Sequence, residues 1–195
     1  MKHKRSEATR ARIIAASRQL FLENGFDATS VAEICRVSGV SNGALFHQFP
    51  VKEDIAFAVY TEVRAEFWDQ VISAMTSADE PLDGIEAAVR AALEFQQAEP
   101  GGAAFMFDVS GSKWIERYAN KAQPLHDAVS ARGLEWSLPH VAAGRLPQVL
   151  PDVFIALASG APQWIARMSR IGMTDASLDL IAAELPRYVR RAFTP

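Results

Sequence analysis

The sequence has little of what several classes of protein need. Cys35 is its single cysteine among 195 residues, which excludes an internal disulfide and fits the reducing cytoplasm. No uninterrupted apolar run approaches the ~20 residues that span a bilayer. The basic N-terminal stretch MKHKRSEATRAR precedes no apolar segment, so we expect no secretory signal. We therefore expect a cytoplasmic protein with no membrane partner.

The sequence also lacks a recognisable arrangement for catalysis or metal binding. Its four histidines are His3, His47, His126 and His140. None of them forms an i, i+4 pair beside an acidic residue, and Cys35 is distant in sequence. No nucleophile elbow or phosphate-binding glycine loop is present, and Gly101-Gly102 is interpreted as a turn. We therefore expect no enzyme, no metal and no cofactor.

Charge is unevenly distributed along the chain, whose net charge is −3. Through Lys52 there are eight basic and four acidic residues, so the first quarter carries +4 and the remainder −7. Such an asymmetry is expected when one end of a protein meets nucleic-acid phosphate. Chance variation within a short segment is the alternative interpretation.

Residues 9–25 predict one amphipathic helix and its two ends. Apolar residues recur at three- and four-residue steps from Ile13 to Phe21, the period of one helical face. We expect residues 1–8 to lie outside this helix and Thr9 to cap its start. Gly25 suits the position just after its end, where a left-handed backbone is common.

A second helix is expected to begin at Val31. Thr29 or Ser30 can supply its N-cap, because a side-chain hydroxyl accepts an unpaired N–H of the first helical turn. Glu33 lies three residues after Ser30, which is the spacing of a capping box.

The stretch Val31–Phe49 predicts two short helices joined by a tight turn. Gly39 stands where the chain must reverse, a position that favours a residue tolerant of positive φ. Ser41 is a good N-cap for the second helix, and Leu45 then points back toward Ile34. This layout is a helix-turn-helix, in which the second helix enters the DNA major groove.

The remainder of the chain predicts further helices and no internal repeat. Residues 105–109 have strand propensity, but we expect helix there because no partner strand is visible. Pro162 and Pro186 are expected to kink the last two helices. The expected helices cover residues 52–76, 82–97, 124–143, 151–170 and 175–193, with another that starts at 103 and is interrupted by Gly111 and Ser112. The breaks include Glu99–Gly102 and Gly144–Pro147.

Residues from about Thr9 to Val59 resemble the DNA-binding region of TetR-family transcriptional regulators. The matching segments are ARIIAASRQLFLENGFDATSVAEI and SGVSNGALFHQFPVKEDI. The resemblance implies an all-α homodimer with a three-helix DNA-binding head (1–50), joined by a long helix to a ligand-binding and dimerisation body (51–195). It also implies a palindromic operator, usually repression, and release by a small-molecule effector that enters the body.

The DNA-contact candidates lie on two helices and the segments before them. On or near the exposed side of the recognition helix are Ser41, Asn42, Gly43, Ala44, Phe46 and His47. Thr29, Ser30 and Lys52 are candidates for phosphate contact. Asn42 can hydrogen-bond a base edge, and Ala44 can contact a thymine methyl group. Phe46 departs from the family, which commonly has tyrosine there, so a phosphate hydrogen bond is missing. The alternative is that these residues merely face solvent.

Effector and dimer residues are predicted from apolar patterns. The effector candidates are Phe67, Phe95, Phe105, Phe107, Trp114, Tyr118, Trp136 and Trp164, although aromatics at helical spacing are often core residues. The resemblance implies that the last two helices form the dimer interface. The dimer candidates are Phe154, Leu157, Ala158, Ala161, Ile165, Met168, Leu178, Ile181, Leu185 and Tyr188.

Three alternatives remain open at this point. The chain could be a constitutive DNA-binding regulator whose body is a filled core. It could also be an enzyme or small-molecule carrier on a helical bundle, with a vestigial head. Cys35 could be a redox sensor, although a free cysteine commonly fills a small apolar slot, and we expect packing.

Overall fold

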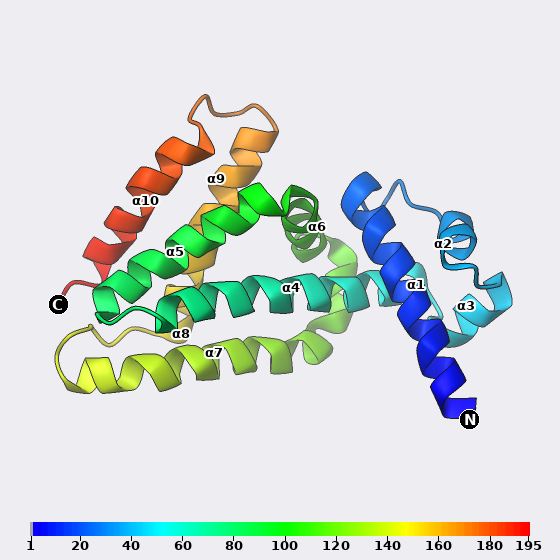
Figure 1. Cartoon of the computed structure of the whole chain (residues 1–195), viewed down its shortest axis with the longest axis horizontal. Coiled ribbons are helices and arrows are strands. Elements are labelled where there is room, and N and C mark those ends of the chain that lie inside the picture. The colour runs from blue at the N-terminus through cyan, green and yellow to red at the C-terminus, as the bar shows by residue number, and fades with distance from the viewer. Residues whose placement is uncertain (1) are drawn as a thin grey trace. The chain divides into compact units, whose positions relative to one another are not determined.

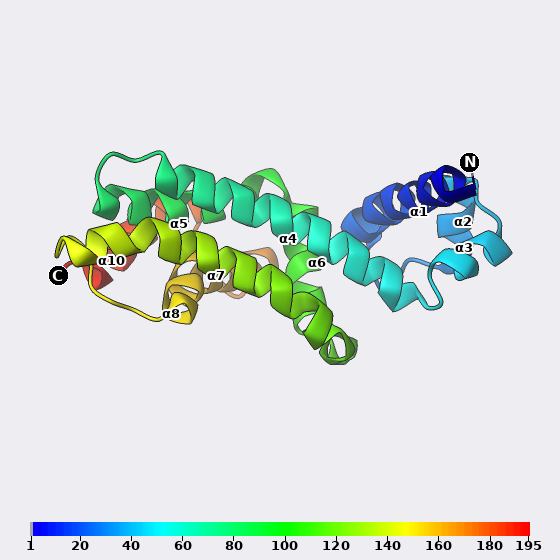
Figure 2. The same ribbon diagram turned by 90° about the horizontal axis from the view of Figure 1, so that it is seen from below.

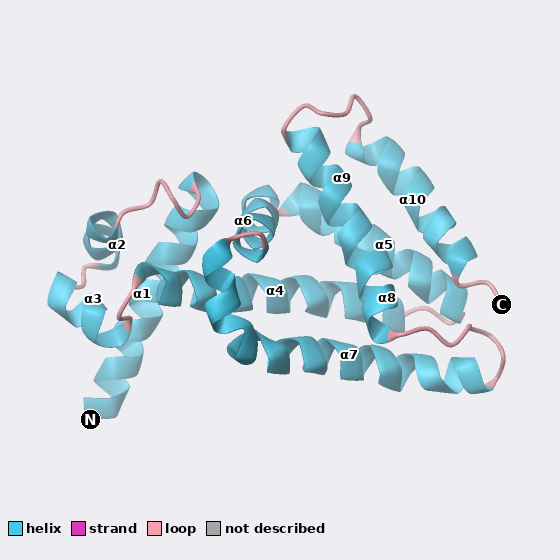
Figure 3. Ribbon diagram, turned by 180° about the vertical axis from the view of Figure 1, so that it is seen from behind, coloured by secondary structure: helices cyan, strands magenta, loops and turns pink. Residues whose placement is uncertain are grey.

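The computed structural model describes residues 2–195, with side chains from Arg5 onward. Every regular element in this described part is a helix (Figure 3). The elements are α1 (Lys2–Asn24), α2 (Val31–Ser38), α3 (Asn42–Gln48), α4 (Lys52–Thr76), α5 (Pro81–Ala98), α6 (Pro100–Ser110), the 3₁₀ helix η1 (Lys113–Tyr118), α7 (Ala119–Ala142), α8 (Pro151–Ile155), the π-helical η2 (Ala156–Gly160), α9 (Ala161–Arg170) and α10 (Leu178–Ala192). The predicted all-α fold class is confirmed.

The chain forms two units, each with its own core. The first comprises Met1–Arg64 and Gly101–Asn120, and the second comprises Ala65–Pro100 and Lys121–Pro195. Helix α4 therefore contributes its first half to the first unit and the rest to the second. The domain boundary predicted at residue 50 falls inside the first unit, which also takes in α6 and η1.

In the first unit, α1 packs against α2 and α3 (Figure 2). Ile34 and Leu45 are fully buried beneath it. The predicted start of α1 was wrong: the helix runs from Lys2, and the Thr9 hydroxyl lies inside it, donating to the Arg5 carbonyl at 2.9 Å. Residues 2–8 contain no helix breaker and several good helix formers, so the helix extends into them. Its predicted end is confirmed, since Gly25 has φ 84°.

The helix-turn-helix has the predicted caps. Ser30 and Glu33 form a complete capping box at the start of α2. Gly39 adopts the left-handed conformation at φ 63°, and the Ser41 hydroxyl accepts the Ala44 N–H at 3.3 Å. These local signals fix the ends of both helices because each satisfies backbone groups that the helix itself leaves unpaired.

In the second unit, α5 packs against α9 and α10 (Figure 1). Their shared core includes Ile85, Val89, Leu93 and Val189. The last part of α4 and α7 lie side by side (Figures 1 and 2), and Arg132 of α7 donates to Asp69 of α4. No helix in the described residues is both long and apolar enough to cross a bilayer.

Several predicted helix ends shift. The loop predicted at Gly101-Gly102 is wrong, because both glycines lie in the first helical turn of α6. Helix α7 begins at Ala119 and contains Pro124, and the helix expected over residues 151–170 is interrupted by the π-helical turn η2 just before Pro162. A π turn accommodates the missing proline N–H without ending the helix.

Candidate functional site

Helix α3 presents a polar face to solvent in the first unit. Ser41, Asn42, Gly43 and His47 are exposed, and Ala44 is half-buried. The buried side chain of Leu45 fixes the helix from the opposite side. The structure therefore brings the predicted base-contact candidates together on one surface of the recognition helix, with the small Gly43 and Ala44 leaving its backbone open to close approach.

Phe46 lies at the edge of this surface and is 43% exposed. An exposed phenylalanine offers apolar contact and no hydrogen-bond donor. The absence of a phosphate hydrogen bond at Phe46 stays a prediction.

The two hydroxyl residues before α2 have different surroundings. Ser30 is exposed, and its hydroxyl donates to Glu33 at 2.8 Å. Hydrogen bonds from the Ser30 backbone N–H and hydroxyl lower the pKa of Glu33. Thr29 is 1% exposed, and its hydroxyl donates to the carbonyls of Gly25 and Leu20. Thr29 therefore holds the turn between α1 and α2, and we correct its assignment as a phosphate contact.

Lys52 also has an internal role. Its ammonium donates to the carbonyls of Phe26 at 2.8 Å and Thr29 at 2.9 Å, and lies 4.0 Å from the centre of the Phe26 ring. Two of the three ammonium donors thus tie the start of α4 to the turn before α2. No local pattern could predict this contact, because the partners are carbonyls more than 20 residues away in the chain.

Arg12 was missed as a positioning residue. Its guanidinium donates to the carbonyls of Ser38 and Gly39. Carbonyls at the C-terminal end of a helix such as α2 have no partner within the helix. A cation there also complements the helix dipole. The only sequence signal was a basic residue in the preceding helix, and its target depends on the fold.

Cys35 is half-buried, so its side chain is more exposed than that of a fully buried core residue. The described residues contain no group of three or more histidine, cysteine, aspartate and glutamate side chains able to hold a metal ion.

Four predicted effector aromatics belong to the first unit. Phe105 stacks on Phe21 with ring centres 5.5 Å apart, and Trp114 packs on Phe26 at 5.3 Å. The Tyr118 hydroxyl donates to Asp54 at 2.8 Å. Burial, together with this hydrogen bond, raises the pKa of Tyr118. The cavity of the second unit is lined by none of these four aromatics: Phe105, Phe107, Trp114 and Tyr118.

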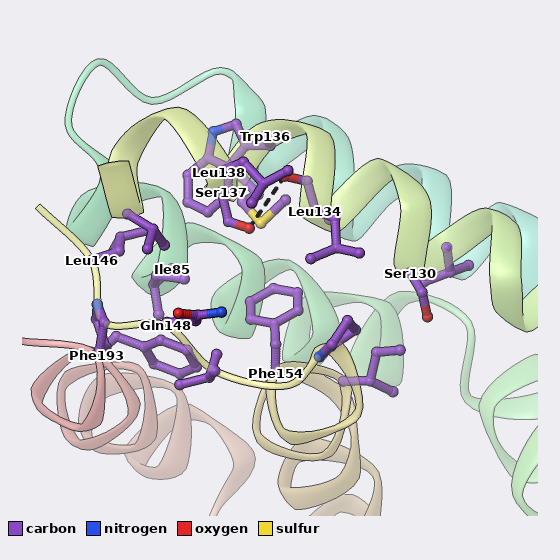
Figure 4. Close-up of a pocket in the computed structure, with 18 residues that line it drawn as sticks. Ile85, Ser130, Leu134, Trp136, Ser137, Leu138, Leu146, Gln148, Phe154 and Phe193 are labelled. Carbon is purple, nitrogen blue, oxygen red and sulfur yellow. Dashed lines mark hydrogen bonds between the residues drawn. The ribbon is translucent and has the colours of Figure 1, made fainter. Parts of the chain in front are cut away.

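The second unit contains a cavity that is open to solvent and has about 90 Å³ of space for water-sized molecules (Figure 4). Its walls come from the end of α4, the start of α5, α7, the segment 146–151, α8 and Phe193. Of the predicted effector residues, only Trp136 lines it. Phe67 and Phe95 pack edge to face in the core at 5.2 Å, and Trp164 is 58% exposed.

Trp136 forms a fixed wall of this cavity. Its ring packs so closely on α5 that a Cβ at Gly84 would lie 2.9 Å from it. His140 meets it edge to face at 5.0 Å. Burial and the nearby Arg145 guanidinium lower the pKa of His140.

The predicted dimer residues mostly face the interior of their own unit. Ala158 is fully buried, and five others pack on its core: Phe154, Leu157, Ile165, Ile181 and Leu185. Tyr188 alone of the set is a large exposed hydrophobic residue. Within one chain, these apolar faces bury against α5 and the 146–151 segment, and the predicted dimer interface stays a prediction.

A helix-turn-helix with an exposed recognition helix, followed by a helical unit with a cavity, is an arrangement typical of helical DNA-binding regulators. Residues 13–59 match the sequence profile described as bacterial regulatory proteins, tetR family. The curated regulator UidR of Escherichia coli is 34% identical over 80 residues, covering 41% of this chain and 37% of UidR. LmrA of Bacillus subtilis is 25% identical over 134 residues, covering 66% of this chain and 67% of LmrA. The alignment with UidR thus spans less than half of that relative.

Solved structures share the whole fold. A TetR-family regulator from Marinobacter aquaeolei has a TM-score of 0.73 at 16% identity and covers 98% of each chain. One from Shewanella has a TM-score of 0.70 at 22% identity, covering 96% of this chain and 98% of that one. Residues 13–59 thus match the TetR-family DNA-binding profile, and the chain shares its fold with TetR-family regulators.

Proposed function

We propose that this chain is a DNA-binding transcriptional repressor that acts as a homodimer in the cytoplasm and releases a palindromic operator when a small molecule binds its second unit. The observation that carries the proposal is the intact recognition helix: Ser41 caps it, Leu45 anchors it, and its polar face is exposed. Because the same segment matches the family profile, that face is the proposed DNA-reading surface.

The proposed base contacts are Asn42, Ala44 and His47, with Ser30 and the first turn of α3 toward phosphate. Gly43 allows the backbone to approach the groove. Phe46 would meet sugar or thymine methyl groups, since it has no donor for phosphate.

The proposed dimer seam uses the outward apolar side chains of α9 and α10. Trp164, Leu180 and Tyr188 are each more than half exposed. An exposed apolar patch marks an interaction site, and in this proposal a second copy covers these three side chains. This placement replaces the inward-facing residues expected from the sequence.

The proposed mechanism is a shift between two populations. Two recognition helices must be about one turn of DNA apart, ~34–36 Å, to bind adjacent half-sites. An effector that binds better to a conformation with another separation weakens DNA binding by its differential affinity for the two states.

Fluorescence anisotropy with labelled DNA from around the protein's own coding locus tests DNA binding. We expect saturable binding that weakens with salt, and Asn42→Ala should lower operator affinity by ~1–3 kcal/mol if Asn42 pairs with a base. Asn120→Ala, also exposed in the first unit, is the matched control. Failure of the wild-type chain to prefer any of these DNAs over random sequence would refute the proposal.

A constitutive regulator with a filled body is the second candidate. The buried aromatic pair Phe67 and Phe95 favours it, because this part of the second unit is packed core. The cavity beside Trp136 favours the effector-responsive regulator, and ligand binding there decides between them.

A further inference from the structure

The cavity in the second unit has an uncharged, mostly apolar lining. None of the side chains that line it is acidic or basic. Most of its wall is aliphatic or aromatic, with Trp136, Phe154 and Phe193 as the largest members. An ionised ligand group would enter this space without a counter-ion, which is costly in an apolar environment.

Three polar side chains interrupt the apolar wall: Ser130, Ser137 and Gln148. The Ser137 hydroxyl already donates to the Leu134 carbonyl at 3.4 Å. Figure 4 shows the Gln148 side chain extending toward the middle of the cavity, between Ile85 and Phe154. A primary amide offers both donors and an acceptor, so it can meet one neutral polar group of a ligand.

We infer that this cavity binds a small, uncharged, mainly apolar molecule whose single hydrogen-bonding group meets the Gln148 amide, and that it discriminates against carboxylates of the same shape. The inference rests on the proposed function only in taking this cavity as the effector site. It places that site at the end of the second unit where α7, α8 and Phe193 meet, and Trp136 alone of the effector aromatics predicted from the sequence lines it.

The chain offers a blocking variant that should preserve the fold. Gly133 lies in α7 and lines the cavity, and a Cβ built on it meets no atom within 4 Å. Gly133→Leu therefore fills the space with a side chain that also favours helix more than glycine does. Ala131→Leu is the matched control, because Ala131 is exposed on the same helix and does not line the cavity.

The test uses the full chain and the neutral fluorophore N-phenylnaphthylamine, displaced by octanol or octanoate at about pH 8, where the carboxylate is ionised. We expect octanol to displace the probe at a concentration about tenfold or more below that of octanoate, since an unpaired charge is disfavoured in the cavity. Gly133→Leu should abolish probe binding, and Ala131→Leu should leave it unchanged. Gln148→Lys should narrow or reverse the preference by supplying a counter-ion.

Each outcome has a definite meaning. Equal displacement by octanoate in the wild-type chain would overturn the selection for uncharged ligands, and probe binding that survives Gly133→Leu would overturn the site. Anisotropy on operator DNA is measured with the same samples. DNA binding without octanol binding would refute this inference alone, whereas octanol binding without DNA binding would refute the proposed function and leave the cavity assignment standing.

Discussion

At the scale of single residues, two glycines lie inside helices for opposite steric reasons. Gly101 begins α6 so close to α1 that a Cβ there would lie 2.5 Å from the Leu22 carbonyl oxygen. Gly133 lies in α7 with open space where its Cβ would be. The first glycine is required by backbone contact, and the second only weakens its helix.

Alanine substitution should therefore have opposite effects at these two positions. Gly101→Ala should lower the free energy of unfolding by roughly 1–3 kcal/mol, because backbone must move to admit the methyl group. Gly133→Ala should raise it by about 0.5–1 kcal/mol through helix propensity. Urea denaturation followed by circular dichroism measures both, and a neutral Gly101→Ala would show that α6 can shift away from α1 freely.

Tyr118 should make stability fall at alkaline pH. Burial and the hydrogen bond to Asp54 raise the pKa of Tyr118 in the folded state. Its contribution to the free energy of unfolding is therefore fully present below the pKa of an unfolded tyrosine, ~10, and is lost as pH rises above that value. Tyr118→Phe should lose less stability than wild type between about pH 8 and pH 10.5. Tyr60, whose pKa burial also raises, remains in both proteins. Parallel pH profiles of the two proteins would contradict the prediction.

Residue roles were predictable from sequence where the partner is local. Ser30, Glu33, Gly39 and Ser41 act on backbone groups within a few residues, so their spacing was enough to predict them. Trp136 and the other aromatics could not be sorted this way, because periodicity shows that a side chain faces inward but not whether the space before it is filled.

At the scale of elements, the helix-turn-helix depends on cations from outside it. Arg12 of α1 holds the end of α2, and Lys52 at the start of α4 holds the turn before α2. The sequence predicted each short helix from its caps and apolar face. It could not predict these long-range clamps, since they join residues more than 20 positions apart whose proximity exists only in the folded chain.

Lys52→Met tests the clamp while keeping most of the apolar stem. Loss of two charge-assisted, partly buried hydrogen bonds to backbone carbonyls should lower the free energy of unfolding by ~1–3 kcal/mol. Lys113→Met, at an exposed lysine of the same unit, should change it little. Urea titrations of the two variants compare them directly. Equal stability of both variants would show that Lys52 is free to serve DNA phosphate, as the sequence alone predicts.

At the scale of the whole molecule, the units do not coincide with a simple division of the sequence. Residues 101–120 lie beyond two helices that contribute to the second unit, yet they belong to the first. The local sequence does not predict contact between segments so far apart, because each segment has only the pattern of an ordinary helix. The fold class was therefore accessible from the sequence, whereas membership of α6 and η1 in the first unit was not.

Assembly into dimers should depend on Trp164 and not on its neighbour Ile165. Trp164 points outward from α9, so Trp164→Glu should leave the chain folded and convert dimers to monomers in sedimentation experiments, because a charge then replaces a large apolar contact. Ile165 packs on the core of its own unit, so Ile165→Glu buries an unpaired charge and should lower the melting temperature instead. Dimers that persist in Trp164→Glu would place the interface on another face of the second unit.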